Sequence, residues 1–360
     1  MQLPPRITSP DHPALDDLCR ILAAEAVRLD DRDEWPAEAL RLCGEYGVYR
    51  WFLPEAWGGL AWSEADLVRG YLRLSAASLV VTFILTQRSG ACSRIVGSEN
   101  AAVQDRWLFD LASGAAFATV GISHLTTSRR HLAKPVLTAR HDGSDFILDG
   151  ISPWVTGAPA ADMVVLGATL DDGRQILAAV DTDRPGFVVP PPPRLVGLSA
   201  SMTGAVHLSD VRIPGNCVLA GPIENVMQAG KGAGTGGLQT STLAVGLSHA
   251  AIDYLEAESI KRPDLTGPGA ELRREQLTLS DNLLALADGE AVCTSEDLRT
   301  RANSLVLRAT QAALGAAKGT GYVVGHPAGR WCREALFFLV WSCPQAVLSA
   351  NLCELAGIEG

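Results

Sequence analysis

The stretch KGTGYVVGHPAGRWCREALFFLVWS, from Lys318 to Ser342, is the most informative part of this chain. The Gly-Thr-Gly-Tyr turn at Gly319–Tyr322 is expected to close one helix, because glycine is favoured just past a helix end. A loop then runs to Pro327, and Arg330 and Arg333 open an apolar helix. The sequence Trp-Ser-Cys-Pro ends that helix, because proline cannot continue it. The stretch therefore predicts two helices joined by a loop.

The composition predicts a compact globular protein. Of the 360 residues, 47% are hydrophobic, which is typical of a chain with a large core. The formal net charge is -10, so nucleic acid or an anionic membrane surface is not an expected partner. Eight cysteines occur without a C-x-x-C pair, which gives no support to a zinc or redox site. A reducing, cytoplasmic compartment is the expected location.

Two apolar runs are expected to be buried helices rather than membrane spans. Ala76–Leu85 is about half as long as the roughly 20 residues that cross a bilayer. Ala335–Leu352 is longer, but Ser342, Pro344 and amide side chains interrupt it. The first residues, MQLPPRITSPDHP, also lack the apolar stretch of a secretory signal.

The periodicity of the hydrophobic residues changes twice along the chain. Across His12–Ala115 they recur every three or four positions, as in amphipathic helices. Across Phe117–Leu219 short apolar runs alternate with Asp-Gly and Pro-Gly turns, which favours a small antiparallel barrel or sandwich. The expected strands include Phe146–Leu148, Met163–Leu166, Ile176–Val180 and Ala205–Leu208. From Val226 onward helices return, with breaks expected at Pro263–Gly269 and Glu290–Asp297.

This order predicts an α+β fold with three domains. Residues 1–115 would form an N-terminal α-helical domain, and residues 116–222 a middle antiparallel β-barrel. Residues 223–360 would form a C-terminal four-helix bundle. Helices, then a barrel, then a helical bundle is an uncommon order, and it narrows the choice of fold.

Four motifs follow one another in a characteristic order. The first is FLPEAWGG at Phe52–Gly59, and the second is LDGISPWVTG at Leu148–Gly157. The third is LSDVRIP at Leu208–Pro214, and the fourth is the segment Gly319–Arg333. Together they cover nearly the whole chain and resemble the acyl-CoA dehydrogenase superfamily, whose fold has this order of domains.

The resemblance implies an FAD cofactor. It places Trp154 against the flavin ring and Thr156 near the reactive N5 atom, and it puts Ser123 in the segment that lines the flavin pocket. An indole can shield the ring face, and a hydroxyl can hold N5. A buried tryptophan and a threonine favoured in strands are the alternative interpretation of Trp154 and Thr156.

The resemblance also implies an oligomer. Gly319, Gly321 and Tyr322 would approach the adenosine pyrophosphate of an FAD bound by a neighbouring subunit, since glycines allow close approach. A helix C-cap explains these glycines nearly as well. A homodimer or homotetramer is therefore expected, and an electron-transfer flavoprotein is the partner that the family implies.

Three departures from the family pattern concern the chemistry. The stretch L-T-E-P-x-x-G-S-D, which binds flavin and acyl-CoA in the family, is replaced by Gly121–His131. The segment that carries a family arginine to the flavin phosphates corresponds to Ser259–Asp264. The family's catalytic glutamate aligns with Ser342, and its alternative position falls near Gly236. Neither residue can remove the α-proton of a thioester unaided.

Candidates for the missing chemistry follow from these positions. His124 and Ser342 are the catalytic candidates, because an imidazole can act as a base or a donor at neutral pH. Arg129, Arg130 and His131 are candidates for binding the substrate, because a guanidinium binds phosphate or carboxylate in a bidentate way. Ordinary loop contacts and solvent-facing arginines are the alternative interpretation.

The leading hypothesis is an FAD-dependent oxidoreductase that acts on an acyl thioester, such as an acyl-CoA, or on a related small substrate. The bond to be oxidised would be CH–CH, and no metal is expected. The first alternative is a flavin-dependent monooxygenase or oxidase on the same fold, because such relatives do not need the glutamate. The second alternative is a non-catalytic scaffold homologue.

Overall fold

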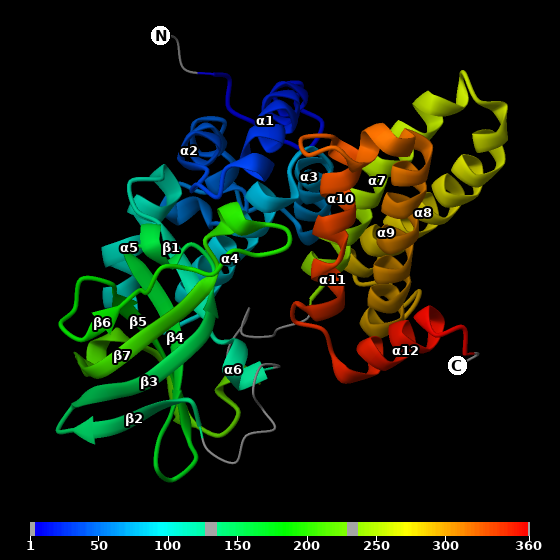
Figure 1. Ribbon diagram of the computed structural model, residues 1–360. Coiled ribbons are helices and arrows are strands. Elements are labelled where there is room, and N and C mark those ends of the chain that lie inside the picture. The colour runs from blue at the N-terminus through cyan, green and yellow to red at the C-terminus, as the bar shows by residue number, and fades with distance from the viewer. Residues whose placement is uncertain (1–3, 127–134, 229–236, 359–360) are drawn as a thin grey trace.

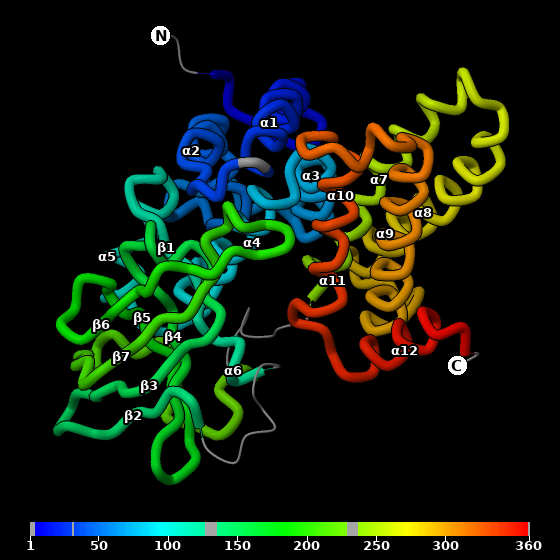
Figure 2. Tube along the Cα trace, in the orientation of Figure 1, coloured from blue at the N-terminus to red at the C-terminus, as the bar shows by residue number. Residues whose placement is uncertain are grey.

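The computed structural model describes residues 4–126, 135–228 and 237–358. Figure 1 shows a group of helices at the N-terminal end, a twisted sheet below them, and a set of long helices at the C-terminal end. The trace in Figure 2 shows that the N-terminal helices reach across to both other parts. The predicted α+β order of helices, sheet and helices is confirmed.

The N-terminal helices are α1 (Ala14–Asp31), α2 (Ala37–Glu45), α3 (Glu64–Ala77), α4 (Leu79–Val96) and α5 (Ala101–Ser113). At the start of α3, Ser63 Oγ accepts a hydrogen bond of 3.1 Å from the Asp66 N–H, as expected of an N-cap residue. The apolar run Ala76–Leu85 is buried but belongs to two helices. Ser78 lies between α3 and α4 in an extended conformation, with φ -156°.

Eight strands form one sheet within the described residues. They are β1 (Ala118–Gly121), β2 (Leu137–Asp142), β3 (Asp145–Val155), β4 (Met163–Thr169), β5 (Gln175–Asp181), β6 (Phe187–Val188), β7 (Gly204–Ile213) and β8 (Val218–Ile223). The order is β6-β7-β3-β2-β4-β5-β8, and β1 also pairs with β4. Most pairs are antiparallel, as predicted, but β1 and the Thr138 position of β2 run parallel to β4. Neither strand is joined to β4 by a short hairpin, so nothing forces an antiparallel pair.

The C-terminal helices are α7 (Gln239–Ser259), α8 (Thr266–Ala287), α9 (Ser295–Ala317), α10 (Pro327–Ala335), α11 (Phe337–Val340) and α12 (Gln345–Leu355). The short helix α6 (Ser123–Thr126) follows β1. Helix α7 packs closely on α3, where Ser75 Oγ donates to Leu243 O at 2.8 Å. A Cβ on Gly246 would lie 2.6 Å from Leu72 O, so this contact requires glycine.

One predicted boundary in the C-terminal part is wrong. The break expected at Pro263–Gly269 is shorter, because α8 already begins at Thr266. Pro268 is tolerated there because the N–H groups of a first helical turn have no intrahelical partner. The predicted interruption of the run Ala335–Leu352 is confirmed, because the run is divided between the end of α10, α11 and α12. Pro344 precedes α12 and prevents one continuous helix.

Within the described parts of the chain, every helix is too short or too polar to cross a membrane.

Candidate active site

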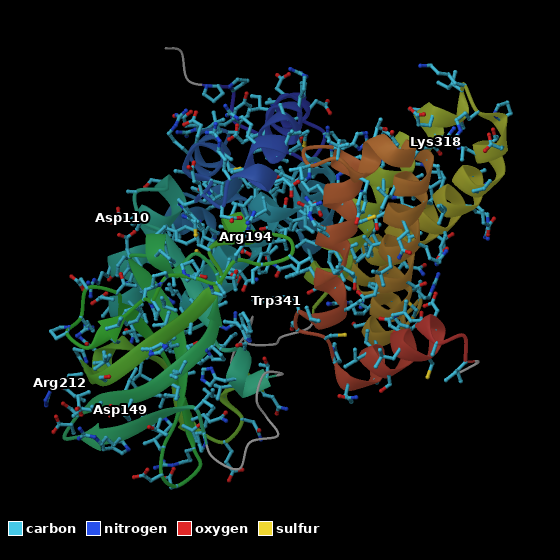
Figure 3. All side chains as sticks on the ribbon, in the orientation of Figure 1. Asp110, Asp149, Arg194, Arg212, Lys318 and Trp341 are labelled. Atoms are coloured by element: carbon cyan, nitrogen blue, oxygen red, sulfur yellow. The ribbon has the colours of Figure 1, made fainter. Side chains whose placement is uncertain are left out.

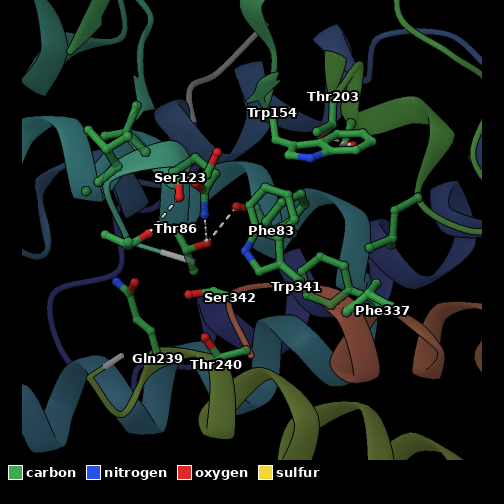
Figure 4. Close-up of a pocket in the computed structure, with 18 of the residues that line it drawn as sticks. Phe83, Thr86, Ser123, Trp154, Thr203, Gln239, Thr240, Phe337, Trp341 and Ser342 are labelled. Atoms are coloured by element: carbon green, nitrogen blue, oxygen red, sulfur yellow. Dashed lines mark hydrogen bonds between the residues drawn. The ribbon is translucent and has the colours of Figure 1, made fainter. Parts of the chain in front are cut away.

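A cavity of about 850 Å³ lies between the sheet and the helices. Its walls come from α4, the β1–α6 segment, β3, the segment that leads into β7, the start of α7, and the α10–α11 segment. Figure 4 shows side chains from these separate elements converging on one space. The volume falls within the range of roughly 300–1,000 Å³ that is typical of small-molecule sites.

One side of the cavity, which we call the sheet wall, consists of Ser123, Trp154, Ser201 and Thr203. Trp154 lies near the end of β3 and is 41% exposed, although its neighbour Val155 is fully buried. Successive residues of a strand point to opposite faces, so the indole points out of the sheet core. It offers a ligand a flat apolar face.

Ser123 adds an unsatisfied polar atom to the sheet wall. Its Oγ atom is buried and has no hydrogen-bond partner among the described residues. Leaving a buried hydroxyl unpaired costs about 1–3 kcal/mol, so native proteins generally avoid it. Because Ser123 also lines the cavity, a ligand that supplies this hydrogen bond would fit here.

The other hydroxyls of the sheet wall form a chain. Thr203 Oγ1 lies 2.9 Å from Thr156 Oγ1 and 2.8 Å from Ser201 Oγ. Thr203 and Ser201 line the cavity, whereas Thr156 lies behind them and does not. The Gly157 N–H donates to Ser201 O at 2.9 Å and fixes the two backbone segments relative to each other.

The opposite side, which we call the helical wall, consists of Phe83, Phe337, Trp341 and Ser342. The ring of Phe83 in α4 lies 4.8 Å from the ring centroids of both Phe337 and Trp341. These edge-to-face contacts hold α11 against α4. Figure 3 shows Trp341 at the side of the C-terminal helices that faces the sheet.

Ser342 is held in position by buried polar contacts with α9. Arg299 Nη2 donates to Trp341 O at 3.1 Å, and Asn303 Nδ2 donates to Phe338 O at 3.0 Å. Arg299 and Asn303 are themselves joined by a bond of 3.0 Å between Nε and Oδ1. Ser342 has a φ of +44°, which is uncommon for a residue with a Cβ, so the backbone conformation depends on these contacts.

The ionisable residues among the described lining residues are Glu64, Arg94 and Arg333. Glu64 is exposed at the first residue of α3. Arg333 donates two hydrogen bonds, of 2.7 and 2.5 Å, to the Asp30 carboxylate. Burial lowers the pKa of the Arg94 guanidinium to about 10, so it remains cationic at neutral pH. The described lining therefore contains no buried carboxylate or imidazole that could remove a proton.

Comparison with known proteins agrees with this architecture. Residues 9–115 match the family model "Acyl-CoA dehydrogenase, N-terminal domain". Over 343 residues the chain is 25% identical to the probable acyl-CoA dehydrogenase YngJ of Bacillus subtilis, which covers 87% of this chain and 88% of the relative. Residues 9–115 thus form an acyl-CoA dehydrogenase N-terminal domain, and nearly the whole chain is similar to members of the acyl-CoA dehydrogenase superfamily.

Further members of the superfamily are similar over most of the chain. The mitochondrial short-chain specific acyl-CoA dehydrogenase of Bos taurus is 25% identical over 355 residues, covering 90% of this chain and 84% of the relative. The solved structure of butyryl-CoA dehydrogenase from Megasphaera elsdenii superposes with a TM-score of 0.79 at 16% identity, covering 95% and 97% of the two chains. The observed fold thus has the order of helices, sheet and helices that the superfamily resemblance predicted.

Of the residues predicted to form the site, the structure brings Ser123, Trp154 and Ser342 together around the cavity. Thr156 is buried behind Thr203 and does not line it. The roles predicted for these residues stay predictions, but their placement is compatible with one shared site.

His124 does not line the cavity. Its Nε2 atom lies 2.7 Å from Gly167 O, and its Nδ1 atom is buried without a partner. Burial lowers the pKa of the imidazole, which favours the neutral ring with a proton on Nε2. Its role as a base stays a prediction, and this hydrogen bond directs the proton-bearing nitrogen to the backbone.

Gly319, Gly321 and Tyr322 lie in a short 3₁₀ helix, Lys318–Tyr322, outside the cavity lining. Figure 3 shows Lys318 at the upper end of the C-terminal helices, away from Trp341. Tyr322 is 87% exposed, so its side chain is available to another molecule. The predicted contact with a neighbouring subunit's cofactor stays a prediction.

The predictions for Arg129, Arg130, His131 and Gly236 fall outside the described residues.

Among the lining residues that no family motif would have identified are Arg94, Ser201 and Thr203. The sequence SASMT at 199–203 does place several hydroxyls directly before a predicted strand. That pattern alone indicates a loop, and the register of β7 with β3 is needed to bring Thr203 beside Thr156.

Proposed function

We propose that this protein binds FAD and is an oxidoreductase that acts on an acyl thioester or a related small substrate. The observation that carries the proposal is that one cavity is lined both by the partly exposed Trp154 indole and by the buried, unpartnered Ser123 hydroxyl. Names of similar proteins support it, including a glutaryl-CoA dehydrogenase in complex with FADH2 and an FMN-bound protein named TdsC.

The residues present fit a flavin. The Trp154 indole is flat, apolar and partly exposed, which suits the face of an aromatic ring system. The Ser123 hydroxyl would give a polar edge of that ring the hydrogen bond that the protein leaves unmade. A bound flavin would supply an acceptor for the hydride removed from the substrate.

The rest of the lining would bind and enclose the substrate. Phe83, Phe337 and Leu336 form an apolar surface that excludes water from the reacting atoms. Gln239 and Thr240, at the start of α7, offer polar groups on the other side of the space (Figure 4). They could accept or donate hydrogen bonds to a thioester carbonyl or its acyl chain.

The proton that leaves the substrate α-carbon has no evident acceptor in the described lining. Ser342 stands where the family glutamate is expected, and an unassisted hydroxyl is too weakly basic to take that proton. This observation favours a second candidate, a flavin-dependent monooxygenase or oxidase, whose chemistry does not begin with α-proton removal.

We further propose that the protein is a homo-oligomer. Tyr322, Val323 and Val324 form an exposed apolar run beyond α9, which a second copy of the chain would cover. If the reaction is a dehydrogenation, an electron-transfer flavoprotein is the expected acceptor of the electrons.

The test uses the purified protein loaded with FAD. Dye reduction that depends on an acyl-CoA thioester is the result expected of a dehydrogenase. Oxygen consumption with an added flavin reductant and substrate is the result expected of a monooxygenase or oxidase. A folded protein with neither activity and no flavin absorbance would support the scaffold alternative and contradict the proposal.

A further inference from the structure

Three aromatic side chains of the helical wall, Phe83, Phe337 and Trp341, form one cluster. The rings of Phe337 and Trp341 are nearly parallel, with an interplanar angle of 19° and 5.4 Å between their centroids. Phe83 approaches both from α4, with its ring at 64° and 83° to theirs. All three line the cavity, but Phe83 is only 2% exposed, whereas Phe337 and Trp341 are partly exposed. The cluster therefore presents two parallel rings to the cavity and supports them with a third.

The backbone holds these two rings in place. The Trp341 N–H donates to Phe337 O at 2.9 Å, and this bond closes a helical turn that puts both side chains on one face. Arg299 and Asn303 hold the turn from α9 through Trp341 O and Phe338 O, at 3.1 and 3.0 Å. Because the rings are fixed in advance, little side-chain entropy is lost when a ligand packs on them.

The lining residues of α4 change from apolar to polar along the helix. Phe83 lies near the start of α4, Thr86 and Gln87 follow one turn later, and Ser93 and Arg94 lie near its end. At 1.5 Å per residue, Phe83 and Ser93 are about 15 Å apart along the helix axis. An acyl thioester such as an acyl-CoA joins an apolar acyl group to a polar, charged carrier. The Phe83 end of the cavity therefore suits the acyl group, and the Ser93 end suits the carrier.

The aromatic cluster favours one kind of acyl group. A linear alkyl chain gains the same burial from any apolar wall, whereas a planar ring also makes offset-stacked or edge-to-face contacts with other rings. We propose that the substrate's acyl group carries an aromatic ring, which packs on the two parallel rings of Phe337 and Trp341. This inference rests on the proposed function, because it names the acyl group of the thioester proposed above.

The proposed position of the flavin leaves this cluster to the substrate. Figure 4 shows Phe83, Phe337 and Trp341 together at one side of the space and the Trp154 ring at another. A flavin that stacks on Trp154 covers that indole, so the rings of the helical wall stay open to the substrate. The acyl group would then lie between the flavin and the aromatic cluster, with its carrier directed along α4.

The test measures thioester binding by the full chain loaded with FAD. It compares CoA thioesters of acyl groups with equal carbon number: 3-phenylpropionyl, 3-cyclohexylpropionyl and nonanoyl. Anaerobic titrations followed by flavin absorbance give the dissociation constants. We expect the phenyl compound to bind about threefold to tenfold more tightly than the cyclohexyl compound, because only the phenyl ring makes aromatic contacts. The ratio of these two constants is called the phenyl preference.

Two leucine substitutions separate contact with the ligand from packing within the wall. Phe337→Leu removes a ring that lines the cavity but keeps an apolar side chain, and we expect it to abolish the phenyl preference. Phe338→Leu is the matched control, because Phe338 is fully buried, lies 5.2 Å from Phe337 between ring centroids, and does not line the cavity. This control should keep the wild-type preference. A ratio of dissociation constants does not depend on the folded fraction, so partial unfolding does not mimic either result.

The inference is overturned if the wild-type protein binds the phenyl and cyclohexyl compounds equally well, or binds the nonanoyl compound most tightly. It is also overturned if Phe338→Leu abolishes the preference as fully as Phe337→Leu, because the cluster would then act only through packing. Both outcomes leave the proposed function standing. Failure of the proposed function looks different: the wild-type protein then binds no FAD, or binds FAD and none of the thioesters, and the inference falls with it.

Discussion

The two walls of the cavity differ in what they offer a ligand. The sheet wall has hydroxyl residues at Ser123, Ser201 and Thr203 and the partly exposed indole of Trp154. The helical wall is aromatic, and its one hydroxyl among the four residues is that of Ser342. In the superfamily's pattern the first wall faces the cofactor and the second carries the base. The residues proposed to contact the cofactor and the position of the missing base therefore lie on separate elements, so one can change while the other is retained.

The largest expected effect comes from giving the helical wall a base. Ser342→Glu should accelerate anaerobic reduction of bound FAD by an acyl-CoA thioester by about 10²- to 10⁴-fold, the usual contribution of a positioned general base. Stopped-flow absorbance measures the rate. Ser342→Gln is the control, because it has a similar size but cannot take a proton. Equal rates in Ser342→Glu and Ser342→Gln would show that the lack of a carboxylate base on the helical wall does not limit flavin reduction.

The next effect comes from loosening the helical wall. Asn303→Leu removes the bonds to Phe338 O and Asn351 Oδ1 and leaves the buried Arg299 with one partner fewer. We expect the free energy of unfolding to fall by about 3 kcal/mol in urea denaturation. Ser304→Ala, on the exposed side of α9, should change it by less than about 0.5 kcal/mol. If Asn303→Leu leaves the free energy of unfolding unchanged, α11 is held by its aromatic contacts alone.

A change in the sheet wall should affect the cofactor instead. Trp154→Ala removes the indole face, and we expect FAD binding to weaken by about 10- to 100-fold, as loss of an aromatic contact of about 2 kcal/mol would. Titration followed by absorbance measures this. Trp57→Ala is the control, because Trp57 packs against Phe109 away from the cavity. If both variants bind FAD equally well, the flavin does not lie on Trp154.

The smallest expected effect is a pH dependence within the helical part. Glu334 in α10 is buried, and this burial raises the pKa of its carboxyl to about 7. Between the ordinary pKa of about 4.5 and the raised value, the folded protein binds more protons than the unfolded chain. Stability should therefore fall as pH rises through this range, by about 1–3 kcal/mol.

Glu334→Gln tests this pH dependence, because an amide does not titrate. Thermal or urea unfolding between pH 4.5 and 7 should show a flatter stability profile in this variant. An unchanged slope would mean that the nearby Arg330, whose Nε lies 3.7 Å from Glu334 Oε1, keeps the carboxyl ionised throughout.

Much of the fold could be predicted from the sequence because its signals are local. Hydrophobic periodicity identified α7 and α9, and turn residues separated the strands at Phe146, Met163 and Ile176. The periodicity did not predict the break between α3 and α4 at Ser78 or the start of α8 before Pro268, because packing and helix-end effects determine both positions. The parallel pairing of β1 with β4 is a long-range contact that no local pattern encodes.

The site was less predictable for the same reason. Trp154 and Ser342 stand in motifs and could be aligned, and both line the cavity. Thr203 and Arg94 have no motif, and they reach the cavity only through the register of β7 and the course of α4. The role predicted for His124 stays a prediction, and its ring, which does not line the cavity, is bonded to Gly167 O. A side chain's direction depends on tertiary contacts that a single sequence does not state.

The most direct test of the account is a titration of FAD into the wild-type apoprotein, followed by visible absorbance and tryptophan fluorescence. The account predicts saturation at one FAD per chain, with the flavin bands perturbed and the Trp154 emission quenched as the ring stacks on the indole. A flavin spectrum that stays that of free FAD at every ratio, with unchanged fluorescence, would contradict it.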